Sequence, residues 1–205
     1  TCALPISVIN AQADASMGSS VSSIFNKTNA SPRGLFFPPM PHNDEAGWKR
    51  AIAVAPHFAK AVVTNFIGSS DSNKSFEGMN YPYPIFVTME KTSEDLSYHL
   101  TEAVMENYDQ FKDSGPGMDG YQLSNQNFSW IFPYHPGAVK YYKKKGVWTS
   151  KHDKHNANLI KRQDVLAKAW QKTLKVNLSG DAFKKKWLEN RASALKAAGM
   201  PNAYN

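Results

Sequence analysis

The sequence lacks the features that usually identify a membrane span, a disulfide framework or an enzyme. No apolar run approaches the roughly 18 residues that cross a bilayer, and only one cysteine occurs in 205 residues. The sequence contains no Gly-x-Ser-x-Gly elbow and no Walker loop. The sequence therefore lacks the nucleophile motif of an α/β-hydrolase. We predict a protein that is not an enzyme and needs no cofactor.

The single cysteine, Cys2, lies in an opening stretch that we interpret as non-biological. Residues 1–7, TCALPIS, can be reverse-translated into the end of a common short-read sequencing adapter, so we exclude them from fold prediction. The alternative is a genuine strand, ALPISVI, from an incomplete gene. Under both interpretations the true N-terminus is missing, and we expect a C-terminal fragment of a longer protein. Without Cys2 the chain has no cysteine, which suits an exported bacterial protein without disulfides.

Acidic residues are scarce in the last third of the chain. From Lys140 onward 16 Lys/Arg face 4 Asp/Glu, whereas residues 1–139 carry 8 against 13. A basic region can bind nucleic acid or an anionic membrane, or it can be the solvated face of surface helices, which we favour. The hydrophobic content of 41% and aromatic content of 12% indicate a globular chain.

The order of apolar and polar residues predicts an α/β protein whose C-terminal third is helical. The segment AKAVVTNFIG is compatible with a helix or a strand, and SSDSNKSFEGMNYPYP is predicted to be a loop. A helix is expected from Asp44 to just before Pro56. Strands are expected at the start of VINAQADAS, at residues 35–37 and at IFVTM, residues 85–89.

Three later helices follow from capping residues and apolar periodicity. Thr92 or Ser93 is expected to cap the first, and the second begins near Asn156. The third begins near Asp181 and ends at Gly199. The apolar stripe predicted for the first helix consists of Leu96, Leu100, Ala103, Val104, Tyr108 and Phe111.

No group of polar residues makes a convincing catalytic or metal site. His152, Asp153 and His155 have a spacing that could hold a metal, but no further ligands accompany them, so an exposed helix start is favoured. His42, Asn43 and Asp44 are equally well explained by a helix cap. Ser193 and Lys196 match Ser-x-x-Lys inside a Lys/Ala-rich helix, which indicates a chance match. Asp14 with Glu90 or Asp95 could form a carboxylate pair, but nothing fixes their separation.

The segment FPYHPGAVKYYKKKGVWT, residues 132–149, combines a histidine, aromatic residues and lysines. Base-stacking aromatics interleaved with lysines are typical of single-strand binding, although the preceding residues are net acidic. The alternative is structural: Pro136-Gly137 form a turn, a two-turn helix follows, and Gly146 ends it. The lysines then lie in the last turn, where they complement the helix dipole. His135 is expected to hydrogen-bond a neighbouring element.

Five segments in this order resemble the C-terminal part of the TAXI-type solute-binding proteins of TRAP transporters. They are QADAS, SPRGLFFPP with DEAGWKR, NYPYPIFV, LSYHLTEAVMENYDQF and PYHPGAVKYYKKKGVW. In the segment LSYHLTEAVMENYDQF, the residues that match the family's helix pattern are Tyr98, Thr101, Ala103, Glu106 and Asn107. In the segment PYHPGAVKYYKKKGVW, the residues that match the family's His-Pro-Gly-Ala pattern are His135, Pro136, Gly137, Ala138, Tyr141 and Gly146. The resemblance covers residues 8–175, and the basic tail from Lys175 onward is longer than the family pattern leads us to expect.

The resemblance implies a periplasmic-binding-protein type II-like fold with two α/β lobes, incomplete here, and a helical C-terminal third. Residues 8–82 would be part of the second lobe, and residues 83–205 the crossover strand and the helices returning to the first lobe. It further implies an exported, periplasmic monomer whose signal peptide lies upstream. Its partners would be a small solute, a dicarboxylate or amino acid, and the TRAP membrane subunits, with no nucleic acid and no metal.

Ligands of α/β folds bind at the carboxyl ends of strands, where helix N-termini face an anion. The predicted ligand-binding residues after the first strand are Asp14, Ala15, Ser16, Met17 and Ser19. Tyr81 and Tyr83 of the NYPYP loop form a second candidate group, and Trp48 is expected in the core. The alternative function is a nucleic-acid or polyanion-binding domain that uses the basic C-terminal third.

Overall fold

The computed structural model describes residues 3–81, 85–115 and 117–203, and the described chain is mainly helical. A single two-stranded sheet occurs within these ranges. The helices and strands, in chain order, are α1 (Ala3–Ile9), α2 (Ile24–Asn29), α3 (Glu45–Val54), β1 (Ala59–Val63), β2 (Phe76–Asn80), α4 (Glu94–Glu106), α5 (Tyr108–Phe111), the 3₁₀ helices η1 (Met118–Tyr121) and η2 (Leu123–Asn125), α6 (Pro136–Lys144), α7 (Ser150–Leu174) and α8 (Gly180–Ala197).

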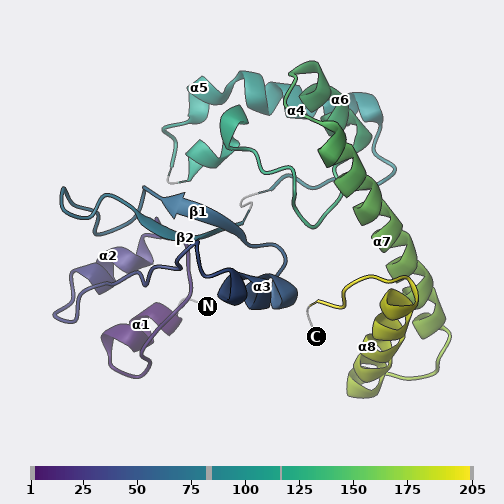
Figure 1. The fold of residues 1–205 in the computed structure, drawn as a ribbon, viewed down its shortest axis with the longest axis horizontal. Coiled ribbons are helices and arrows are strands. Elements are labelled where there is room, and N and C mark those ends of the chain that lie inside the picture. The colour runs from purple at the N-terminus through teal and green to yellow at the C-terminus, as the bar shows by residue number, and fades with distance from the viewer. Residues whose placement is uncertain (1–2, 82–84, 116, 204–205) are drawn as a thin grey trace.

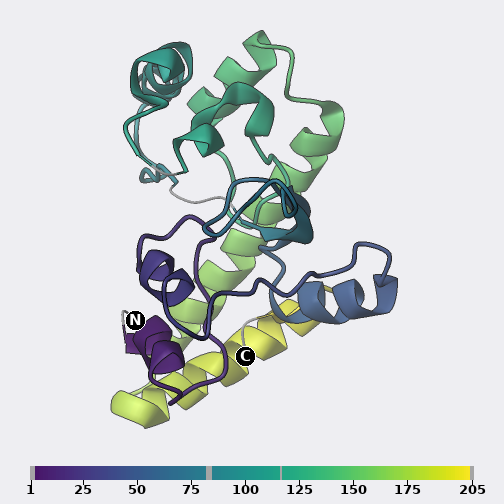
Figure 2. The same cartoon turned by 90° about the vertical axis from the view of Figure 1, so that its left-hand side faces the viewer.

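These elements form three groups, which Figure 1 shows as separate parts of an arc. The N-terminal group combines α1 to α3 with the β1–β2 ribbon, and the middle group contains α4 to α6. The third group is the antiparallel pair α7–α8, in which only α7 begins beside the middle group. In both Figure 1 and Figure 2 the N-terminal group and the α7–α8 pair lie on the same side of the middle group.

In the N-terminal group, α3 begins where the sequence predicts. The Asp44 side chain accepts a hydrogen bond from Gly47 N–H at 2.8 Å and so caps the helix. Trp48 on this helix is 4% exposed and belongs to the core, as expected. AKAVV forms β1, which pairs antiparallel with β2, with Ala59 opposite Asn80 and Val63 opposite Phe76.

Three predictions for this group were wrong. Residues 3–9 form a helix, so neither a strand ALPISVI nor a strand beginning at Val8 exists. Residues 76–80, predicted as part of a loop, form β2, because their pairing with β1 outweighs the weak strand propensity of FEGMN. Residues 35–37 form no strand. Instead the partly buried ring of Phe37 packs against Phe25, Phe66 and Phe76, while Phe36 is 79% exposed, so the predicted buried strand was wrong in both its backbone and its burial.

The predicted strand IFVTM is also absent, since residues 85–89 carry no strand assignment. Phe86, Val87 and Met89 are 63%, 79% and 79% exposed. A strand needs a partner for its backbone hydrogen bonds, and the described part of the chain offers this segment none. The helices with one small ribbon are consistent with part of an α/β fold, and the crossover strand expected between two lobes is not formed.

In the middle group, α4 has the predicted cap but presents a different face to the core. Ser93 Oγ accepts from Leu96 N–H at 3.1 Å, which confirms Ser93 as the cap. The predicted stripe was wrong, because Leu96 and Leu100 are 61% and 45% exposed while Ser97 is buried. The small Ser97 side chain faces α6 at the closest approach of the two helices.

An aromatic cluster forms the core beneath these two helices. Phe128, Tyr141, Tyr142 and Trp148 are all buried, and Tyr134 packs against them. Tyr142 stacks on Trp148 with an interplanar angle of 13°, while Phe128 meets both rings edge-on. Burial raises the pKa of the Tyr134 hydroxyl to about 12.

The two C-terminal helices match the sequence prediction, except that α7 starts six residues before Asn156. The earlier start is explained by a capping box, in which Thr149 and His152 each bond to the other's backbone. Between the helices Asn190 Nδ2 donates to Thr173 Oγ1 at 3.0 Å, and both residues are buried. Gly199, at φ +65°, follows α8 as expected.

Candidate functional site

The first group of predicted ligand-binding residues lies in an exposed segment next to the carboxyl end of β1. Ser20 fixes this segment: its Oγ donates to the Asn65 carbonyl oxygen, and its own carbonyl oxygen accepts from Ile67 N–H, both at 3.0 Å. Ser19 precedes this anchor directly, and Met17 is 68% exposed. Asp14 and Ala15 are exposed and Ser16 is partly exposed, so these side chains are accessible to a solute.

Tyr81 lies at the opposite end of the ribbon. It follows β2, and its ring centroid is 5.7 Å from that of Phe58, just before β1. A five-residue strand spans about 13 Å, so Ser20 and Tyr81 are separated by roughly the ribbon's length. The structure therefore does not bring the two groups into one pocket. Tyr83 lies outside the described residues, and the binding role of all these residues stays a prediction.

A polar hollow of about 580 Å³ lies in the loop that leaves β1, close to the Ser20 anchor. Its lining residues carry hydroxyls and one pair of opposite charges, and they are Thr64, Ser69, Ser70, Asp71 and Lys74. All five lining residues are exposed, so the hollow is open to solvent. Lys74 Nζ lies 3.5 Å from Asp71 Oδ1, and both side chains are largely exposed. An anion entering the hollow could replace this weak surface pair with its own charge.

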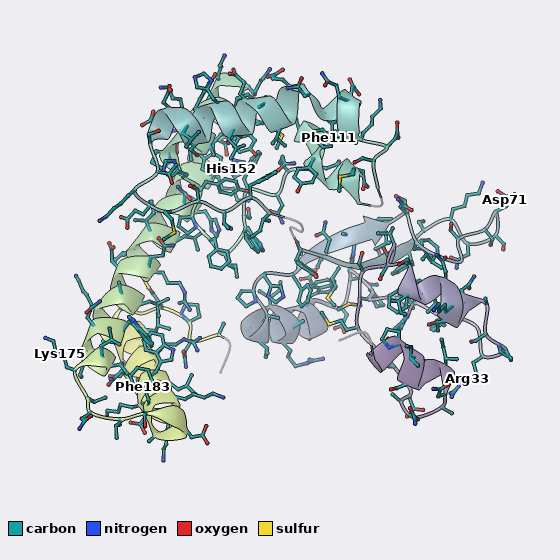
Figure 3. All side chains as sticks on the ribbon, turned by 180° about the vertical axis from the view of Figure 1, so that it is seen from behind. Arg33, Asp71, Phe111, His152, Lys175 and Phe183 are labelled. Atoms are coloured by element: carbon teal, nitrogen blue, oxygen red, sulfur yellow. The ribbon has the colours of Figure 1, made fainter. Side chains whose placement is uncertain are left out.

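Two residues hold this loop against the N-terminal group. Phe66 is 5% exposed and packs edge-on against Phe76 at 5.2 Å between centroids. Gly68 has φ +84°, which favours glycine, and a Cβ added there would lie 2.8 Å from Asn29 Oδ1 and displace the Asn29 side chain of α2. Figure 3 labels Asp71 at the outer tip of the loop, away from the other groups. The sequence indicated only a polar loop, SSDSNK, and the hollow depends on how Phe66 and Gly68 hold it.

The second feature is the contact between α4 and the segment that begins at His135. Its ring caps α6, with Nδ1 accepting from Gly137 N–H at 3.3 Å, while Nε2 lies 3.1 Å from the Thr92 carbonyl oxygen. These two bonds together require the neutral tautomer with the hydrogen on Nε2. His135 therefore connects two elements, as predicted, and the geometry gives it no reacting partner.

The charged residues along this contact form two similar clusters. In one, Tyr98 OH donates to Glu102 at 3.0 Å and Lys144 donates to Tyr98 at 2.8 Å. In the other, Tyr141 OH donates to Glu106 at 2.8 Å, and Lys145 pairs with the same carboxylate. The hydrogen bond from Tyr98 lowers the pKa of Glu102, and that from Lys145 lowers the pKa of Glu106.

These pairs account for the lysine run that motivated the nucleic-acid alternative. Lys140 pairs with Glu94, and Lys143 pairs with Asp153 at 2.9 Å. Tyr141 and Tyr142 are 1% and 4% exposed, so neither ring can stack on a base. The run therefore serves the packing of α6 against its neighbours.

The histidine cluster of KHDKHN is used in the same way. His152 belongs to the α7 cap, and the Asp153 carboxylate accepts from Trp148 Nε1–H at 2.9 Å. His155 Nε2 lies 2.6 Å from the Trp130 carbonyl oxygen. Figure 3 shows His152 at the junction of α7 with the middle group. Within the described ranges, no three His, Cys, Asp or Glu side chains gather as a metal site would require.

Part of this chain is similar to a family of binding-protein-like sequences. A sequence model of the NMT1-like family, which is periplasmic-binding-protein-like, matches residues 50–146. This stretch includes the loop with the polar hollow. It ends at Gly146, the glycine that follows α6. No curated protein matches the chain significantly, and neither does any solved structure. No helix of the described residues is long and apolar enough to cross a membrane.

Proposed function

We propose that this chain is the solute-binding component of a TRAP-type transporter of the TAXI family. It would bind a small organic anion or an amino acid and deliver it to the membrane subunits without chemical change. The similarity of residues 50–146 to a binding-protein-like family supports the general role. The membrane partners and a periplasmic location rest on the resemblance of the TAXI motifs.

The observation that carries this proposal is the polar hollow after β1. Hydroxyl groups from Thr64, Ser69 and Ser70 and the ammonium group of Lys74 line one side of this open surface hollow of about 580 Å³. Such groups bind a carboxylate by charge-assisted and neutral hydrogen bonds. The segment that carries Ser16 and Ser19 is bonded to the same loop through Ser20, so its hydroxyls are available from the adjoining side.

Binding would be coupled to a conformational change in the usual thermodynamic way. A solute shifts the population toward the conformation that it binds more tightly, by no more than the difference in its affinities. A solute anion would compete with Asp71 for Lys74, whose Nζ lies 3.5 Å from Asp71 Oδ1. Asp14 is proposed to receive the ammonium group when the solute is an amino acid.

The proposal can be tested by calorimetric titration of the chain with dicarboxylates and amino acids. We expect one solute to bind at one site per chain, and Lys74→Gln and Ser16→Ala to weaken it about tenfold each. Lys91→Gln is the matched control, because Lys91 is an exposed lysine outside the hollow. Failure of every solute to bind would contradict the proposed function, while binding that neither variant weakens would contradict the proposed site.

A further inference from the structure

A second hollow lies far from the proposed solute site, in the groove between α7 and α8. It measures about 300 Å³. In Figure 1 these two helices run side by side, and no other helix or strand lies against the parts that are farthest from the middle group. The residues that line the groove are Val165, Lys168, Ala169, Lys172, Asn190, Ser193, Ala194 and Ala197.

The floor and the rim of this groove differ in chemistry. Val165, Ala169, Ala194 and Ala197 supply an apolar surface, and their small side chains leave the space between the helices unfilled. Lys168 and Lys172 stand four residues apart on α7, so they are neighbours on one helix face. Ser193 adds a hydroxyl from α8 on the opposite side.

The two rim lysines differ from those of α6 in their partners. Lys140, Lys143, Lys144 and Lys145 of residues 140–145 each pair with a carboxylate. Across the described residues, no ion pair involves Lys168 or Lys172. Two like charges at i and i+4 destabilise a helix slightly, and an external anion between them would relieve that repulsion.

We propose that the α7–α8 groove binds a free anionic amphiphile, such as a medium-chain alkyl carboxylate. Its carboxylate lies between Lys168 and Lys172 and its alkyl chain lies along the alanine floor. Charge complementarity selects the anionic head, and the apolar lining selects the chain. The site is separate from the polar hollow after β1, so it does not depend on the proposed transport function.

The probe for this site is decanoate, titrated calorimetrically into the full chain below its micelle-forming concentration. We expect one molecule bound per chain, with up to about a fourfold loss of affinity for each CH₂ removed, since each buried CH₂ contributes to transfer out of water. The variant Lys168→Gln/Lys172→Gln should bind decanoate at least tenfold more weakly. The variant Lys184→Gln/Lys185→Gln removes the same charge from α8 outside the groove and should leave the affinity unchanged.

A further variant tests the contribution of the alkyl chain separately from that of the carboxylate head. Ala197→Leu adds a side chain at an exposed lining position, and it should weaken decanoate more than hexanoate. Equal effects of the two lysine pairs would overturn the proposal, as would binding of many decanoate molecules per chain. The proposal would also be overturned if the protein sedimented with phosphatidylglycerol vesicles but did not bind decanoate, because that result would identify the groove as a membrane contact.

Discussion

Single residues decide how closely α4 and α6 approach each other. At Gly137 an added Cβ would lie 2.6 Å from Tyr98 N and 2.9 Å from Ser97 Cβ, and it would also collide with the Glu94 carbonyl oxygen. Backbone atoms of a helix cannot move away as the end of a flexible side chain can. Glycine is therefore required here by packing and not by its backbone angles, unlike Gly146, whose φ is +72°.

We expect Gly137→Ala to lower the free energy of unfolding of the middle group by roughly 3 kcal/mol, at the upper end of overpacking costs. Urea unfolding measures this change when it is followed by fluorescence in a background that keeps Trp148 as the only tryptophan. Gly115→Ala is the control, because nothing lies within 4 Å of a Cβ at Gly115. Equal stability of the two variants would show that α4 and α6 can separate without cost.

At the scale of elements, α4 and α6 are joined by carboxylates whose protonation weakens the contact. The pKa values of Glu102 and Glu106 are lowered by their bonds to Tyr98 and Lys145 respectively. A carboxyl group whose pKa is lower in the folded state stabilises that state above its unfolded-state pKa. The stabilisation is lost as the pH falls through the folded-state value.

We therefore expect the contribution of these two carboxylates to stability to be constant from pH 7 to about pH 5 and to fall below the ordinary glutamate pKa of about 4.3. The variant Glu102→Gln/Glu106→Gln should be less stable than the wild type at pH 7 and nearly equal to it at pH 3. Urea midpoints measured across this pH range test the expectation. Glu90→Gln serves as the control, since Glu90 is an exposed residue outside the helical contact. If the double variant lost as much stability between pH 5 and pH 3 as the wild type does, this expectation would be contradicted.

The predictable part of these elements is the part that depends on local rules. Asp44 and Ser93 cap their helices as short-range side-chain chemistry requires, and the helix that is followed by Gly146 obeys the same rules. The turn predicted at Pro136-Gly137 was wrong, because these two residues already form the first turn of α6, where proline is tolerated. The buried face of α4 could not be predicted, because the close approach of Gly137 places Ser97 inward and leaves Leu96 exposed. The loop hollow was missed for a similar reason, since Phe66 reaches its partners only in the folded chain.

At the scale of the whole molecule, the packing of helices and strands against one another is most extensive within the three groups, and the first turns of α7 are also bonded to the middle group. Within the described residues, the pairs of elements with the most extensive contacts are β1 with β2, α4 with α6, and α7 with α8. Large apolar side chains are meanwhile left exposed, including Val54, Val87 and Met89 at 70%, 79% and 79%. A protein whose parts bury little surface against one another has weak coupling between their unfolding transitions.

We expect the groups to unfold in separate steps, and the five tryptophans provide a reporter for each. Trp48 lies in the N-terminal group, Trp130 and Trp148 near the middle core, and Trp170 and Trp187 in contact between α7 and α8. Variants that keep only Trp48, only Trp148 or only Trp170, with phenylalanine at the other positions, should show different urea midpoints. Circular dichroism of the wild type is the reference, and it should show a transition broader than any single reporter. Coincident midpoints from all three reporters would mean that the arc folds as one cooperative unit.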